Sequence, residues 1–174
     1  MDDAVLAHYL NDHLAGAEVG LRTAERLADR FDGEDERSLR GMCTAIEEER
    51  DLLRGLLEKL GSDESMLKRG VGVVGGILGS VREAIPVGDA PTVLEDLELL
   101  AIGVWGKRLL WGTLARVAAR DELFADIAVD WLAARAETQE RTLLRIRADQ
   151  IDRSLELSEA TFSAAGPREG TRHE

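Results

Sequence analysis

The sequence has few of the residues on which catalysis, metal binding or disulfide bonding usually depends. It contains one cysteine, three histidines and 4% aromatic residues among 174 residues. The single Cys43 excludes an internal disulfide, and its place beside Met42 on a predicted helix is typical of a quiet buried thiol. No Gly-x-Ser-x-Gly turn is present, and the glycine run GVGVVGGILGS does not match a phosphate-binding loop. These absences argue against the common hydrolases and nucleotide-binding enzymes.

Basic residues are also scarce, with 22 lysines and arginines against 34 acidic residues and a net charge of −12. Proteins that bind nucleic acids or anionic membranes need a basic face, so neither partner is expected. The first ten residues lack the basic and apolar regions of a signal peptide, and the longest uncharged stretch, 70–81, is too short to span a bilayer. Few lysines beside abundant alanine, arginine and glycine are typical of a high-GC bacterium. We expect an acidic, bacterial, cytoplasmic protein.

Only three prolines, at positions 86, 91 and 167, interrupt the chain, which leaves room for long helices. Apolar residues recur at spacings of three and four, and β-branched alternating runs are missing. This pattern predicts helices over residues 3–31 and 35–60, a third from about 92 and a fourth from 121 to about 157 or beyond. Gly33 and Gly61 are predicted to end the first two helices, while a Thr92–Glu95 capping box begins the third and Asp121 caps the fourth.

Residues 62–91 form a long connection between the second and third helices. Apolar residues recur there at helical spacing, at Leu67, Val71, Val74, Leu78, Val81 and Ile85. We expect a short crossover helix that packs on the bundle; association with a membrane surface through residues 66–85 is the alternative. Two hairpins joined by one long crossover form a ferritin-like four-helix bundle, predicted over residues 1–162, with a disordered tail at 163–174.

Glycines interrupt the apolar stripes of two predicted helices. Gly16 and Gly20 lie four residues apart on the first helix, and Gly103, Gly106 and Gly112 lie on the third. Because glycine has no side chain, these positions predict close contact with neighbouring helices. Three tryptophans, Trp105, Trp111 and Trp131, could line a pocket, although aromatic residues at helical spacing belong to the core more often.

The second helix carries a carboxylate in its apolar seam. Its apolar residues alternate at three and four, and Glu49 stands where the next one is due, in the series Leu39, Met42, Ile46, Glu49, Leu53, Leu56 and Leu60. A buried acid needs a partner. Polar residues at mid-helix positions of the third and fourth helices are candidates for a buried salt-bridge network with Glu49, namely Lys107, Arg108, Arg135 and Gln139.

A metal site is the alternative use of this carboxylate. Ferritin-like carboxylate proteins hold two metal ions with Glu-x-x-His motifs, in which the acid and the imidazole share one helix face. No Glu-x-x-His occurs in this sequence. A single or unusual iron or manganese site would have to use His13, Glu18 and Glu49.

Four segments together resemble bacterial ferritin-like four-helix-bundle domains to which no reaction is assigned: YLNDHLAGAEVGL, IEEERDLLRGLLEKLG, LEDLELLAIGVWGKRLLW and LAARAETQ. The resemblance spans nearly all of the chain except the tail. It implies the fold and a homodimer, whereas the metal ligands of ferritins do not carry over because their motif is missing.

From these observations we expect a non-catalytic cytoplasmic helical-bundle protein without a cofactor, with a stress-related role suggested by fold analogy alone. The alternatives are a divergent iron- or manganese-binding protein with oxidase or peroxide-detoxifying activity, and a protein that associates with membrane surfaces.

Overall fold

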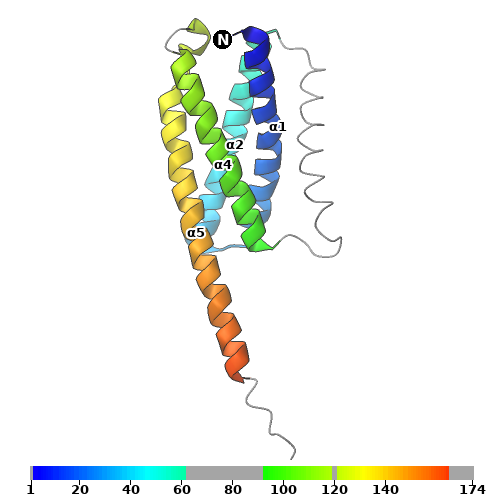
Figure 1. Ribbon diagram of the computed structural model, residues 1–174, viewed down its shortest axis with the longest axis vertical. Coiled ribbons are helices and arrows are strands. Elements are labelled where there is room, and N and C mark those ends of the chain that lie inside the picture. Colours follow the sequence, from blue (N-terminus) through cyan, green and yellow to red (C-terminus); the bar gives the residue numbers. More distant parts are fainter. Residues whose placement is uncertain (1, 62–91, 119–120, 165–174) are drawn as a thin grey trace, which may run out of the picture.

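The computed structural model describes residues 2–61, 92–118 and 121–164, and in this part of the chain the fold is all-α (Figure 1). Four long helices form a bundle: α1 (Asp3–Ala28), α2 (Gly33–Lys59), α4 (Val93–Ala118) and α5 (Val129–Ala164). A 3-10 turn, η1 (Glu122–Phe124), lies between α4 and α5. The predicted all-α four-helix bundle is confirmed.

The helices pair as two antiparallel hairpins, α1 with α2 and α4 with α5 (Figure 1). α1 also packs on α4, whereas α2 and α5 meet much less closely. α2 and α4 run in the same direction, so Gly61 and Thr92 lie at opposite ends of the bundle, and α5 extends beyond the other three helices (Figure 1). The crossover helix predicted for the link, and the membrane-binding segment 66–85, lie outside the described residues.

The helix ends follow the sequence signals in part. Asp2 caps α1, because its Oδ1 accepts hydrogen bonds from the N–H groups of Ala4 at 3.0 Å and Val5 at 3.3 Å. Gly61, with φ of 67°, ends α2 as predicted. Gly33 does not end α1, which stops at Ala28; with φ of 62° it is instead the first residue of α2. The left-handed glycine therefore directs the chain into α2.

The start of α4 confirms the capping box. The Thr92 N–H donates to Glu95 Oε2 at 2.7 Å, and the Glu95 N–H donates to Thr92 Oγ1 at 3.2 Å. Glu95 Oε2 also accepts a hydrogen bond from the Thr92 hydroxyl at 2.9 Å. The two hydrogen bonds that this carboxylate accepts from Thr92 lower the pKa of Glu95, because they favour its charged form.

The predicted start of the last helix is wrong. Asp121 Oδ1 accepts the Leu123 N–H at 3.0 Å and so caps the short turn η1, while α5 begins only at Val129. Phe124 and Ile127 therefore precede α5. The helix continues to Ala164, two residues into the predicted tail, and residues 165–174 lie outside the described part.

The core consists of two apolar clusters stacked along the bundle. One surrounds Trp111 and Phe124, near the start of α1 and α5. The other surrounds Leu27 and Leu97, near the end of α1 and the start of α4. Three buried or nearly buried polar positions, Glu49, Lys107 and Gln139, fall between the residues of the two clusters on α2, α4 and α5.

Among the described helices the glycines make no close contact, so the expected close approach is not found in this part of the chain. A Cβ placed on Gly16, Gly103, Gly106 or Gly112 would meet no described atom within 4 Å. On Gly20 it would meet only Ile46 Cδ1, at 4.0 Å. Larger residues set the distance between helices and leave space beside the glycines.

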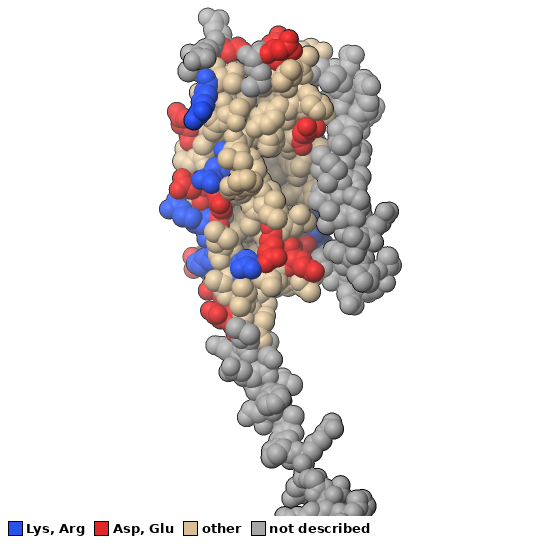
Figure 2. Space-filling view, in the orientation of Figure 1, with Lys and Arg blue, Asp and Glu red and all other residues tan. Residues whose placement is uncertain are grey.

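The outer face of α4 is apolar, and no described helix covers it. Ile102, Trp105 and Leu109 are 65%, 48% and 46% exposed. Figure 2 shows a broad uncharged area across the middle of this face. The homodimer expected from the sequence stays a prediction. No helix in the described part of the chain is long and apolar enough to cross a membrane.

Candidate functional site

The candidate site is the polar layer between the two apolar clusters, together with the cavity beside it. Glu49 comes from α2, Lys107 from α4, and Arg135 and Gln139 from α5. Glu49, Lys107 and Gln139 stand where the heptad pattern of their helices would place an apolar residue, with apolar neighbours three or four residues away on both sides, and Arg135 lies one turn before Gln139 on the same face of α5. The helical period thus directs all four side chains toward the bundle interior.

Glu49 is 3% exposed, and each of its carboxylate oxygens faces a cation. Oε1 accepts hydrogen bonds from Arg135 Nη2 at 2.7 Å and Nε at 3.1 Å. Oε2 lies 2.9 Å from Lys107 Nζ, as an ion pair whose angle falls outside hydrogen-bond geometry. Lys107 Nζ in turn donates to Gln139 Oε1 at 2.6 Å.

Burial lowers the pKa of Lys107 and Arg135 lowers it further, while the Glu49 carboxylate opposes both effects. The predicted buried salt bridges are therefore present.

Arg135 connects this layer to the protein surface. Its Nη1 donates to Glu48 Oε2 at 2.7 Å, and its guanidinium lies 4.5 Å from the ring centre of Trp131. Trp131 is 58% exposed, so it belongs to the surface and not to the core. Its ring holds the guanidinium by a cation–π contact.

Arg108, the other cation proposed for the layer, lies elsewhere. Its Nε is 3.0 Å from Glu140 Oε2, in a pair that is partly exposed to solvent. Lys107 and Arg108 are adjacent on α4 and point about 100° apart, so only Lys107 reaches Glu49.

The three candidate metal ligands, His13, Glu18 and Glu49, do not form a ligand set. Glu18 is paired with Arg50 at 3.1 Å and Arg54 at 2.9 Å. His13 packs edge-on against Tyr9, with ring centres 4.8 Å apart. Among the described residues, no cluster of three or more histidine, cysteine or acidic side chains is arranged to hold a metal ion.

Burial lowers the pKa of His13, and the nearby Asp12 carboxylate offsets this only in part. The unfolded chain therefore binds the proton more readily, so stability must fall as the pH falls through the ordinary histidine pKa of 6.5.

We predict that lowering the pH from about 7.5 to 5.5 shifts the urea midpoint of the wild type downward by more than that of His13→Gln. The window lies above the range in which ordinary carboxylates titrate. His8→Gln is the matched control, because His8 is 72% exposed. Equal shifts in the wild type and in His13→Gln would contradict the prediction.

A second buried carboxylate, Asp96, was not found from the sequence. It is 1% exposed and accepts hydrogen bonds from Arg26 on α1, with Nη2 to Oδ1 at 2.7 Å and Nε to Oδ2 at 3.4 Å. Arg30 Nη1 lies 3.8 Å away. In the sequence, the one indication that Asp96 is buried is its spacing of four residues from the apolar Leu100.

A cavity of about 190 Å³ lies beside the polar layer, among α1, α2 and α4. Glu49 and Lys107 reach it from the layer, and Trp111 and His13 also line it. Four glycines form part of its wall, Gly16, Gly20, Gly103 and Gly106. The rest is mostly apolar, formed by Ala17, Ile46, Leu53, Leu100, Val104 and Leu110.

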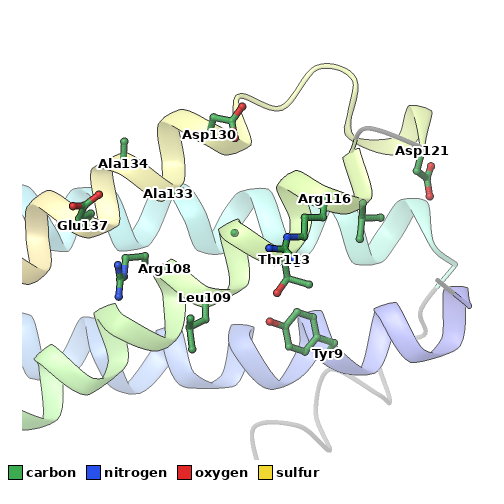
Figure 3. A pocket seen from close by; sticks show the side chains of 12 residues that line it. Tyr9, Arg108, Leu109, Thr113, Arg116, Asp121, Asp130, Ala133, Ala134 and Glu137 are labelled. Carbon is green, nitrogen blue, oxygen red and sulfur yellow. The ribbon is translucent and has the colours of Figure 1, made fainter.

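A larger, open groove of about 1170 Å³ runs between α4 and α5, with Tyr9 of α1 also in its wall (Figure 3). None of Glu49, Lys107, Arg135 and Gln139 lines it. Its acids and bases, among them Arg108, Arg116, Asp130 and Glu137, are spread along its length and do not converge on one point (Figure 3). This groove offers no focused set of groups for chemistry.

Comparisons with protein-family models, with curated proteins and with solved structures find no match.

Proposed function

We propose that this protein is a ferritin-like helical bundle that acts by binding, without a metal centre and without catalysis. The pairing of Glu49 carries the proposal. Both carboxylate oxygens face cations, Lys107 at 2.9 Å and Arg135 at 2.7 Å. A metal ion at this carboxylate would have to displace one cation and lie close to the other, at a high electrostatic cost in a buried place.

The topology supports the ferritin-like part of the proposal. In a simple up-and-down bundle, consecutive helices alternate in direction and need only short loops. Here α2 and α4 run in the same direction, so the link 62–91 joins opposite ends of the bundle (Figure 1). One long crossover between the second and third long helices is the ferritin-like order.

The test is the metal content of untagged protein from cells grown with added iron and manganese, measured by plasma mass spectrometry. We expect far less than one iron or manganese ion per chain. Near-stoichiometric metal in the wild type, lost in Glu49→Ala and kept in the exposed control Glu48→Ala, would overturn the proposal in favour of the carboxylate-metal alternative.

A further inference from the structure

We infer that the cavity among α1, α2 and α4 is a binding site for a small carboxylate with a short apolar body. The inference deepens the proposed binding function and rests on it. Polar groups of the central layer meet an otherwise apolar space there, which is the usual composition of a small-molecule site.

The glycine wall indicates that the space is kept open at a cost. Gly103 and Gly106 lie inside α4, where glycine is less favourable than alanine by roughly 1 kcal/mol each. A Cβ at either position would meet no described atom within 4 Å, so packing among the described residues does not require glycine there. Helix stability is thus sacrificed next to the cavity, as is common at functional sites.

Two side chains beside the cavity each have an N–H group without an acceptor among the described residues. Trp111 is fully buried and lines the cavity, and its Nε1–H has no hydrogen-bond partner among the described residues. An unpaired buried donor is uncommon and costly. Lys107 Nζ has three N–H groups and contacts Glu49 and Gln139 in the described structure, which leaves one for another acceptor. The oxygens of a bound ligand would supply the missing acceptors.

The charges favour an anion as the source of this oxygen. Two cations, Lys107 and Arg135, flank Glu49, which is the one buried carboxylate of the polar layer in the described structure. Glu48, which also contacts Arg135, is 61% exposed, and Asp12 at the cavity wall is 47% exposed, so solvent screens both. One ligand carboxylate therefore balances the buried layer.

The volume limits the size of the ligand. A cavity of about 150 Å³ lined by aliphatic residues holds benzene. At about 190 Å³ this cavity fits a molecule of about eight non-hydrogen atoms, such as hexanoate. The carboxylate would face Lys107 and Trp111, and the alkyl chain would contact the apolar residues and the glycine wall.

The experiment is a titration of the full chain with hexanoate, followed by the indole N–H signals of the three tryptophans in nitrogen-15 NMR spectra. Trp105→Phe and Trp131→Phe assign the signals of the two exposed rings. We expect saturable shifts at Trp111 alone, with hexanamide at least about tenfold weaker because it lacks the charge. No shift at Trp111, shifts only at the exposed tryptophans, or equal binding of hexanamide would overturn the inference.

A matched pair of variants tests the location. Gly106→Leu fills the cavity, whereas Gly55→Leu lies on α2 away from it; both glycines are partly exposed and have room for a side chain. We expect Gly106→Leu to weaken hexanoate binding at least tenfold and Gly55→Leu to leave it unchanged; equal effects would contradict the site. Should Gly106→Leu not fold, Gly106→Ala provides the same comparison against Gly55→Ala. Metal analysis of the same samples separates failure of this inference from failure of the metal-free function.

Discussion

Glu49→Ala is expected to lower the free energy of unfolding by about 3 kcal/mol or more, because it leaves buried cations without their counter-charge. Lys107 is 13% exposed and Arg135 is 18% exposed, so neither can turn fully into water. Arg135 keeps Glu48 as a partner, whereas among the described residues Lys107 keeps only the neutral Gln139. Most of the cost therefore falls on Lys107.

Urea unfolding followed by circular dichroism measures this change, with Glu48→Ala as the control. Glu48 contacts the same arginine but from the exposed side, so its removal is expected to cost less than about 1 kcal/mol. A loss below about 0.5 kcal/mol for Glu49→Ala would show that the carboxylate is solvated and the layer is not closed.

A double variant separates unpaired charge from lost packing. In Glu49→Met combined with Lys107→Met, the cation that depends most on Glu49 is removed as well. Replacing a buried ion pair by apolar residues of similar size is often neutral or stabilising. We expect the double variant to be more stable than Glu49→Met alone, since the two residues are in contact and their effects are not additive.

The position of Glu49 could be predicted because its helix carries a regular seam with one carboxylate in it. The same rule favours Lys107 over Arg108, since Lys107 lies three residues after Val104 and four before Trp111. The sequence alone left both open, because the seam of α4 is weakened by apolar residues on several faces and by three glycines. The contact of Lys107 with Glu49 fixes the choice.

The role of the glycines could not be predicted in the same way. A small residue on a helix face permits either close approach of a neighbour or an open space, and sequence spacing does not distinguish them. Whether such a glycine gives close contact or an open space depends on the distance between the helix axes, and bulky neighbours such as Leu110 and Trp111 help to set that distance. Around Gly103 and Gly106 the outcome is a cavity.

The burial of Asp96 could not be predicted from the sequence, for a different reason. An acid in the first turn of a helix is common, because it interacts favourably with the helix dipole and needs no tertiary partner. Glu95 fits this account, since it is exposed and caps α4. Asp96 is one residue further along and points into the bundle, where Arg26 of α1 meets it across a packing contact that no local pattern reveals.

Asp96→Ala is expected to lower the free energy of unfolding by about 2 kcal/mol, since it removes charge-assisted hydrogen bonds from Arg26. The loss should be smaller than that of Glu49→Ala, because the partners of Asp96 reach water. Arg26 is 44% exposed and Arg30 is 34% exposed, so each can be solvated once the carboxylate is gone.

The same urea experiment measures this difference, with Asp29→Ala as the control. Asp29 also pairs with an arginine, Arg40, at 2.8 Å, but it is 69% exposed, so its removal should have little effect. If Asp29→Ala and Asp96→Ala lower the free energy of unfolding equally, burial of Asp96 adds nothing to the stability that its ion pair provides. If Asp96→Ala lowers the free energy of unfolding as much as Glu49→Ala does, exposure of the partner cation does not reduce the cost of leaving that cation unpaired. The ordering Glu49, then Asp96, then Asp29 thus tests whether burial of the cation, and not of the acid alone, sets the energy of each pair.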